Sequence, residues 1–362
     1  MPALESSIRR IWPAEAGKEA PLPWLFMAIP TEEQIAPHSE RIGRLLTALD
    51  GVLFGQEALL KLVVTGLLAR GHLLLEGLPG LGKTQLVKGL SRALSLETKR
   101  IQFTPDLLPG DITGNPILQE SGGRRQFVFQ PGPLFCHLCL ADEINRASPK
   151  TQSALLEAMQ ERRVTVLGEA HPIPDPFFVL ATQNPIELEG TYPLPEAQLD
   201  RFLFKLDVPR TGLATLQRIV EQREIGVEPE VDPVLTPEEF GAALQMTRQI
   251  YLPEAVANYI ARLVDGTHPG QSNGSSSVKF GASPRAALSL ASAAKAQALI
   301  AGRIHAGFED VKAVAQPVLG HRIILDYDAR IRGLTPAGVI ASLLEEIPFQ
   351  DLALPKSLKS AL

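Results

Sequence analysis

A glycine-rich segment at residues 77–84 has the spacing of a phosphate-binding loop. It matches G-x-x-x-x-G-K-[ST], an apolar run precedes it, and apolar residues at helical spacing follow it. Glycines let backbone N–H groups close around a polyphosphate at a helix N-terminus, where unpaired donors and the helix dipole favour anions. Lys83 would then contact the β- and γ-phosphates, and the Thr84 hydroxyl would bind Mg²⁺. The residues predicted to form this site are Gly77, Pro79, Gly80, Leu81, Gly82, Lys83 and Thr84.

A second apolar run, residues 138–141, ends in two adjacent carboxylates, Asp142 and Glu143. As a strand of a parallel sheet, this run would place both acids at the edge where open α/β sheets bind ligands. Asp142 could then hold Mg²⁺, and Glu143 could polarise the water that attacks the γ-phosphate. An isolated acidic pair is commonly a solvated strand end, but beside a phosphate loop we interpret it as catalytic.

A third apolar run, residues 177–181, brings the amide of Asn184 to the same expected sheet edge. Asn184 could form a hydrogen bond with the attacking water or with the γ-phosphate. An Asn-Pro pair alone is an ordinary turn. Its place beside two nucleotide motifs favours a catalytic role.

Short apolar runs alternate with longer helical stretches between residues 40 and 210, which predicts an α/β core with a mainly parallel sheet covered by helices on both faces. Two inserted hairpins are also expected, one around Gly122-Gly123 and one around Gly168-Glu169. The expected strands are His72–Glu76, Arg100–Phe103, His137–Ala141, Phe177–Ala181 and Leu203–Val208. The expected hairpin segments are Asp111–Gln119 with Gln126–Phe129, and Arg163–Leu167 with Ala170–Ile173.

The strand pattern ends after Arg210, and helical patterns at 254–264, 284–300 and 308–319 predict a small all-helical second domain over residues 236–362. Residues 211–235 are expected to form the linker. Residues 1–39 are expected to be an extension, because six prolines within residues 1–37 interrupt regular structure there. This extension contains both tryptophans, Trp12 and Trp24, and its apolar part is expected to dock on the protein's own core, with a partner or neighbouring subunit as the alternative.

The composition limits the classes of function. The formal net charge is −5, which disfavours a protein held to nucleic acid by an overall basic field, although a local basic patch remains open. No apolar run reaches the roughly 18 residues of a membrane span, and residues 1–10 lack the apolar stretch of a signal peptide, so we expect a cytoplasmic protein. Cys136 and Cys139 are expected to point to opposite faces of a strand, as two buried thiols and not as a metal site.

These segments together resemble AAA+ ATPases, and more narrowly the MoxR family. The resemblance lies in residues 71–84, 141–147, 152–161 and 181–185, and it extends over roughly residues 40–350. It implies an AAA+ P-loop core with a parallel five-stranded sheet, followed by the small helical lid. It also implies a ring, expected to be a hexamer, that hydrolyses ATP with Mg²⁺ and remodels or matures partner proteins. Proteins with von Willebrand factor A domains are the expected partners.

The same resemblance implies roles for further residues. Asn184 would be the sensor-1 residue, Arg201 the finger inserted into a neighbour's site, and Arg285 the sensor-2 arginine that the lid brings to the chain's own nucleotide. Either arginine could instead be an ion-paired surface residue. The two hairpins match insertions that line the ring's pore or face substrate. The segment that borders the adenine would be Phe54, Gly55 and Gln56. His321 and Arg322 match a motif that lies late in the lid. His72 and His321 are expected to be structural, and Arg146 has no assigned role.

Two other functions stay open. One is a nucleotide-gated binding switch that turns over little, and the other is a metal-insertion ATPase subunit similar to magnesium chelatase. Glu143, Asn184 and Arg201 together favour turnover, and the sequence has no Cys/His cluster typical of metal handling. A DNA-remodelling motor is disfavoured by the net charge, although a ring could concentrate basic residues in its pore.

Overall fold

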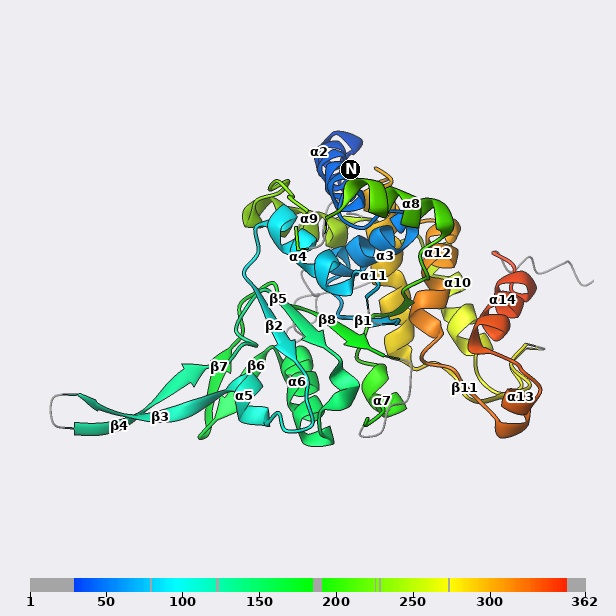
Figure 1. Ribbon diagram of the computed structural model, residues 1–362. Coiled ribbons are helices and arrows are strands. Elements are labelled where there is room, and N and C mark those ends of the chain that lie inside the picture. The colour runs from blue at the N-terminus through cyan, green and yellow to red at the C-terminus, as the bar shows by residue number, and fades with distance from the viewer. Residues whose placement is uncertain are drawn as a thin grey trace, which may run out of the picture.

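Five parallel strands form the central sheet of the protein, in the order β2-β5-β8-β1-β9 (Figure 1). The computed structural model describes residues 29–78, 80–121, 124–184, 191–224, 226–227, 229–272 and 274–349. Trp12, Trp24 and Pro79 therefore lie outside the described residues. The strands are β1 (Leu73–Glu76), β2 (Thr98–Gln102), β5 (Leu138–Asp142), β8 (Phe178–Gln183) and β9 (Phe204–Asp207), and they confirm the five predicted strands.

The central strands are apolar on both faces because helices cover both sides of the sheet. Alternate residues of β1 divide between two hydrophobic clusters, with Leu73 and Leu75 in one and Leu74 in the other. The first cluster contains residues of α2, α3 and α4, and the second contains residues of α6. These helices are α2 (Glu32–Asp50), α3 (Glu57–Leu68), α4 (Lys83–Leu94) and α6 (Pro149–Glu161).

Both expected hairpins are present. The longer one, β3 (Gly114–Ser121) with β4 (Arg124–Pro131), projects far from the body of the molecule (Figure 1). The expected first strand of this hairpin was wrong at its start, because Pro109–Thr113 forms a short helix, α5, in which the Asp111 side chain accepts from the Leu108 N–H. The shorter hairpin is β6 (Arg163–Val166) with β7 (Glu169–Pro172).

The C-terminal part confirms the helical lid. Its helices pack into the same hydrophobic cluster as α2, α3 and α4, so the lid and this face of the sheet share one core. One feature was not predicted: β10 (Val278–Phe280) pairs antiparallel with β11 (Ile324–Leu325), strands too short to give a periodic pattern. The lid helices are α9 (Pro237–Gln249), α10 (Glu254–Gly266), α11 (Pro284–Ile300), α12 (Phe308–Leu319), α13 (Tyr327–Ile331) and α14 (Pro336–Glu346).

Two helices cross the boundaries expected from the sequence. α2 begins at Glu32, inside the expected extension, and buries Ile35, Ile42, Leu45 and Leu49. The expected linker contains α8 (Leu213–Gln222). Two shorter helical turns complete the described elements: η2 (Ile144–Arg146) and α7 (Glu196–Leu199). Within the described residues, every helix is too short or too polar to cross a membrane.

The expected orientation of the two cysteines was wrong. β5 begins at Leu138, so Cys136 precedes the strand, and both cysteines lie in the second hydrophobic cluster instead of pointing to opposite faces. Both are free and fully buried in the second cluster, as two buried thiols were expected to be.

Candidate active site

The glycine-rich loop connects the carboxyl end of β1 to α4 in the way the motif predicts. Gly80 and Gly82 have φ values of 83° and 81°, in the left-handed region that favours glycine. Gly82 is the N-cap of α4 and also lies against Leu53, whose Cδ1 would be 2.4 Å from a Cβ at this position. The loop therefore needs glycine here for both its backbone conformation and its packing. The first N–H groups of α4 are left for a ligand, because no side chain caps this helix.

Lys83 lies in an acidic setting. Its Nζ donates to the Gly77 carbonyl at 2.5 Å. Burial lowers the pKa of Lys83, whereas the nearby carboxylates of Asp142, Glu143 and Glu76 oppose this shift. A phosphate would offer this ammonium group a charged acceptor in place of the carbonyl.

Thr182, on β8, connects the two acids at the end of β5. Its hydroxyl donates to Asp142 Oδ1 at 2.6 Å and accepts from the Glu143 N–H at 2.8 Å. Arg100, on β2, donates to the other oxygen of Asp142, Oδ2, at 2.7 Å. Both carboxylate oxygens of Asp142 are therefore held in place.

Glu143 adopts an uncommon backbone conformation, with φ of 57°. Its Oε2 accepts from Gln102 Nε2 at 3.0 Å and from Arg146 Nη1 at 2.8 Å. Arg146, without a role in the sequence analysis, is thus an ion-pair partner of Glu143. The left-handed turn and these two donors fix where the carboxylate lies.

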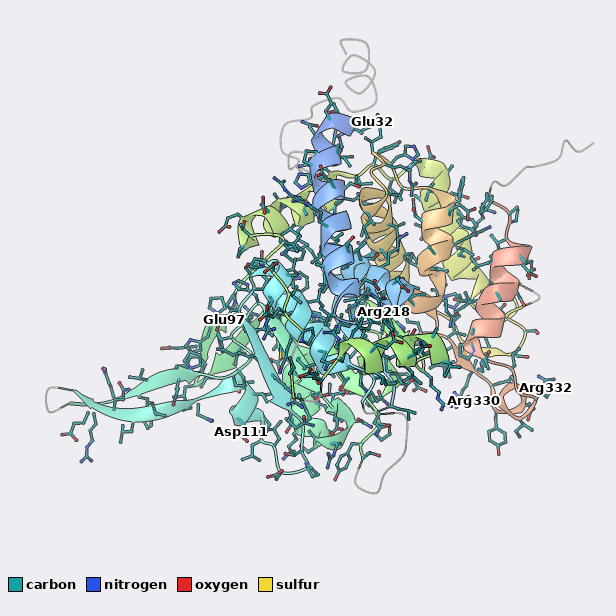
Figure 2. The ribbon with its side chains drawn as sticks, turned by 45° about the horizontal axis from the view of Figure 1, so that its top comes forward. Glu32, Glu97, Asp111, Arg218, Arg330 and Arg332 are labelled. Carbon is teal, nitrogen blue, oxygen red and sulfur yellow. The ribbon has the colours of Figure 1, made fainter. Side chains whose placement is uncertain are left out.

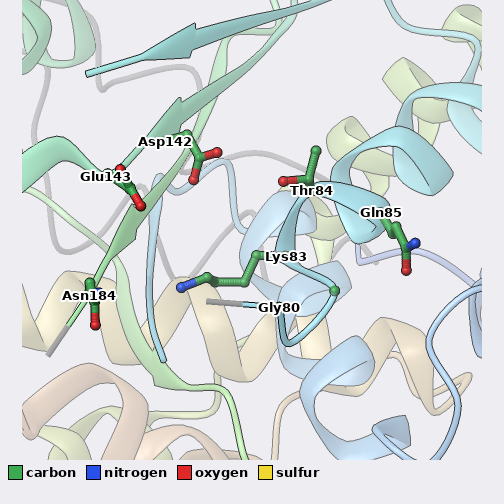
Figure 3. Close-up of a pocket in the computed structure, with 8 residues that line it drawn as sticks. Gly80, Lys83, Thr84, Gln85, Asp142, Glu143 and Asn184 are labelled. Atoms are coloured by element: carbon green, nitrogen blue, oxygen red, sulfur yellow. The ribbon is translucent and has the colours of Figure 1, made fainter. Parts of the chain in front are cut away.

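One cavity of about 300 Å³ brings these groups together. Figure 3 shows Lys83 reaching across it towards Asn184, with Asp142 and Glu143 on one side. Thr84 lies at the start of α4 with its hydroxyl towards Asp142. The sequence-predicted residues that line this cavity are Gly80, Gly82, Lys83, Thr84, Asp142, Glu143 and Asn184.

The segment predicted to border the adenine lies beside the loop. Phe54 is buried, and the guanidinium groups of Arg218 and Arg223 lie 4.0 and 4.6 Å from its ring centroid. Gln56 is also buried, and within the described residues its Oε1 has no hydrogen-bond partner. An unsatisfied buried acceptor next to a phosphate loop is what the amino group of an adenine would satisfy. Gly55 packs closely against Thr215 of α8, whose Oγ1 would lie 2.4 Å from a Cβ at position 55.

The oxygen donors in the cavity suit Mg²⁺. The Thr84 hydroxyl and the Asp142 carboxylate are hard oxygen ligands, and Mg²⁺ usually takes only one or two carboxylates, with the remaining ligands from water and phosphate. These residues fit a nucleotide-bound Mg²⁺ without a dedicated protein cage.

Arg201 and Arg285 lie together, but away from this cavity. Both line a second cavity of about 300 Å³, together with Gly71 and His72. Gly71 and His72 precede β1, whereas the phosphate loop follows it, so the two cavities lie at opposite ends of this strand. Arg285, which was expected to reach the chain's own nucleotide from the lid, therefore lies in this structure at the other end of β1 from the phosphate loop.

Arg322 positions the segment that carries Arg201. Its side chain is only 2% exposed, and it donates to Asp200 Oδ1 at 2.7 Å and to the carbonyls of Asp200, Phe202 and Leu203 at 3.1, 2.7 and 3.2 Å. The His321 ring is 3.1 Å from the Phe202 carbonyl. His321 and Arg322 thus form hydrogen bonds with the residues on both sides of Arg201, the predicted finger.

His72 is structural, as interpreted from the sequence. Its Nδ1 accepts from the Val179 N–H at 3.0 Å, so Nε2 carries the proton and donates to the Met159 carbonyl at 3.1 Å. Burial lowers the pKa of His72 to about 4 and that of His321 to about 3. Both rings are neutral near pH 7.

Sequence reasoning missed Thr182, Arg100 and Gln102. Each contacts Asp142 or Glu143 through a neighbouring strand, and the register that pairs Gln102 with Asp142 is a property of the folded sheet. The one available signal was their location at expected strand ends.

The fold and this cavity define a P-loop nucleotide-binding protein of the AAA+ class. Residues 72–204 match the model of the ATPase family associated with various cellular activities (AAA), and residues 271–342 match the AAA lid domain. The chain is 40% identical over 328 residues to chaperone MoxR1 of Mycobacterium tuberculosis, covering 90% of this chain and 85% of the relative. It is 32% identical to protein MoxR of Paracoccus denitrificans, covering 82% of this chain and 92% of that protein.

A solved structure agrees. The crystal structure of a proposed ATPase from Cytophaga hutchinsonii superimposes with a TM-score of 0.81 at 37% identity, over 88% of this chain and 97% of that one. The chain belongs to the MoxR family of AAA+ ATPases.

Proposed function

We propose that this protein hydrolyses ATP with Mg²⁺. The observation that carries the proposal is the single cavity lined by Lys83, Thr84, Asp142, Glu143 and Asn184. Lys83 and the N-terminus of α4 would bind the phosphates, and Thr84 with Asp142 would hold Mg²⁺, which when bound neutralises phosphate charge. Glu143, fixed by Gln102 and Arg146, would orient and polarise the attacking water, and Asn184 would donate to the water or the γ-phosphate.

The second part of the proposal is a ring, expected to be hexameric. Arg201 and Arg285 lie at the opposite end of β1 from the phosphate loop. β1 alone is about 13 Å long at roughly 3.3 Å per residue, so these arginines are too far away to serve the chain's own nucleotide. A head-to-tail contact would present both arginines to the nucleotide of the next copy. They would stabilise the charge that develops during phosphoryl transfer.

The third part concerns what the ring acts on. We propose that it remodels or matures partner proteins, because a relative at 40% identity is named a chaperone. The long hairpin supports this proposal, since Leu118 of β3 and Phe127 of β4 are paired and 56% and 67% exposed. Apolar side chains on a projecting hairpin could bind unfolded or extended segments. Proteins with von Willebrand factor A domains remain the expected partners.

A mixing experiment tests the proposed function. Phosphate release from ATP should rise more than linearly with protein concentration, and Lys83→Ala and Arg201→Ala should each be inactive. When the two inactive variants are mixed, some interfaces join an intact phosphate site to an intact finger, so activity should partly return. Activity per chain that is independent of concentration, with no rescue after demonstrated subunit exchange, would favour a monomeric nucleotide-gated switch.

A further inference from the structure

α8 presents an apolar stripe to solvent. Leu213, Leu216 and Val220 are 86%, 47% and 81% exposed, and their i, i+3, i+7 spacing places them on one side of the helix. The other side faces the body, where Thr215 abuts Gly55 and Arg218 lies over the Phe54 ring. Figures 1 and 2 show α8 at the outside of the molecule. A surface helix normally turns its apolar stripe inwards, so this stripe is left open by the described residues and suits an interface.

A groove with matching chemistry lies between the core and the lid. Its volume is about 510 Å³, and its apolar lining includes Leu68, Leu252 and Leu288. Leu288, on α11, is 71% exposed. The groove is therefore open and partly apolar.

The same groove is basic. Four cations line it, and Asp175 accepts from two of them, Arg70 and Arg162. Lys295 donates to the carbonyl of Arg248 at 3.1 Å, and burial together with the charge of Arg248 lowers the pKa of Lys295. No carboxylate is among the described residues that line the groove. An occupant with an acidic group would relieve the repulsion between Arg248 and Lys295.

A carboxylate flanks the apolar stripe of α8. Glu221 follows Val220, is exposed beside the stripe, and accepts from Gln217 one turn earlier. α8 is about 15 Å long, and it combines an apolar stripe with a carboxylate at one end. This combination complements a groove that has apolar residues beside Arg248 and Lys295.

We propose that the outward side of α8 docks in the core–lid groove of a neighbouring copy of this chain. The inference rests on the proposed ring. The groove and the Arg201 cavity share Ala69, Arg70, Arg162, Leu288 and Ser292, so a copy that offers its nucleotide to Arg201 also approaches the groove. In that copy α8 lies against Phe54 and Gly55, beside the phosphate loop. A single contact between two copies could thus pair α8 with the groove and the nucleotide cavity with Arg201. It would couple the position of the lid to the nucleotide of the neighbouring copy.

Cysteine cross-linking tests this docking. Chains with Val220→Cys and chains with Leu288→Cys are mixed with ATP and Mg²⁺ and treated with a short bismaleimide, while the native Cys136 and Cys139 are fully buried. We expect a cross-linked dimer that contains one chain of each kind. Tyr327→Cys is the matched control for Leu288→Cys, because Tyr327 is 78% exposed on α13, outside the residues that line the groove.

The outcomes separate the docking from the ring. Assembly by sedimentation without the 220–288 dimer, or with equal cross-linking to Tyr327→Cys, overturns the docking and leaves the ring intact. Absence of any assembly with ATP overturns both. In addition, Val220→Glu should raise the concentration needed for half-assembly about tenfold or more, as expected for an apolar residue at an interface centre. An unchanged assembly midpoint in Val220→Glu also overturns the docking.

Charge reversal provides a second test. Glu221→Arg and Arg248→Glu each place like charges together across the proposed contact, so each should weaken assembly several-fold. Both residues are exposed, so neither change should disturb folding. When the two variants are mixed, every interface between unlike chains pairs opposite charges, so the mixture should assemble better than either variant alone. Two weakened variants without rescue would contradict the proposed pairing of α8 with the groove.

Discussion

The Arg322 Nε donates to Asp200 Oδ1 at 2.7 Å and thereby ties the lid to the segment that precedes Arg201. The other Asp200 oxygen, Oδ2, accepts from Ser283 at 3.3 Å and lies 3.7 Å from Arg285 Nη1. One carboxylate therefore organises the proposed finger and the lid arginine as a unit. Any lid movement that displaces Arg322 would also displace Arg201.

This arrangement predicts that Arg322 positions the finger without touching nucleotide. Arg322→Lys keeps the charge but cannot reproduce the fork of hydrogen bonds to Asp200, Phe202 and Leu203. We expect kcat to fall about tenfold or more, since hydrogen bonds to charged groups contribute about 1.5–3 kcal/mol each. ATP affinity should be unchanged, because the phosphate cavity lies at the other end of β1. A fluorescent ATP analogue measures affinity, circular dichroism verifies folding, and equal loss of affinity and kcat would contradict the prediction.

Lys83 and Glu143 should separate binding from hydrolysis. Lys83→Ala removes the charge that faces the phosphates and should abolish ATP binding. Glu143→Gln keeps the shape of the side chain and should retain bound ATP while turnover falls about 10²-fold or more. Isothermal titration and phosphate release measure the two quantities. Hydrolysis at the parent rate in Glu143→Gln would remove Glu143 from the reaction.

Contiguous motifs were the part of the site that could be predicted. The phosphate loop, Asp142, Glu143 and Asn184 follow apolar strands, and parallel strands bring their carboxyl ends to one edge. For this reason all four predicted features meet in one cavity.

The remaining features depend on tertiary packing. Arg285 is the second residue of α11. The end of the sheet that this helix reaches depends on the hydrophobic core that the lid shares with α2, α3 and α4, and local sequence does not encode this packing. Thr182 and Arg100 reach Asp142 only through strand order and register. Cys136 was misplaced for a smaller reason, because strand ends are uncertain by one or two residues.

Thr182 is predicted to set the geometry of both acids. Thr182→Val removes a hydroxyl that donates to Asp142 and accepts from the Glu143 N–H, while keeping a similar volume. We expect kcat to fall roughly tenfold and the Mg²⁺ concentration for half-maximal activity to rise, because a lost hydrogen bond to a charged group contributes about 1.5–3 kcal/mol. Thr182→Ser should restore most activity. Equal activity of the Val and Ser variants would show that the hydroxyl has no catalytic role.

Arg285 should act on a neighbour's nucleotide and not on its own. In dilute, unassembled protein Arg285→Ala should leave the affinities for ATP and ADP unchanged, since Arg285 lines the second cavity. In concentrated protein it should lower ATP hydrolysis. Arg330→Ala is the control, because Arg330 is an exposed lid arginine on α13 (Figure 2). Calorimetry that finds a narrowed gap between ATP and ADP in the dilute Arg285→Ala chain would place this arginine in its own site after all.

The two buried histidines predict a loss of stability in mild acid. Burial lowers the pKa of His72 to about 4 and of His321 to about 3, whereas an unfolded histidine titrates near 6.5. Below pH 6.5 the unfolded chain therefore binds protons that the folded chain excludes, so the free energy of unfolding falls with decreasing pH until the folded-state pKa is reached.

Each histidine should contribute up to about 1.4 kcal/mol per pH unit in this range. Urea unfolding between pH 7 and pH 5 measures the slope. His72→Gln, which keeps a donor and an acceptor, should reduce the slope by up to this amount, whereas His268→Gln, at an exposed position, should leave it nearly unchanged. If the free energy of unfolding has the same pH slope in the parent and in His72→Gln, His72 does not resist protonation in the folded protein. Its hydrogen bonds to Val179 and Met159 could not then have the donor and acceptor roles described above.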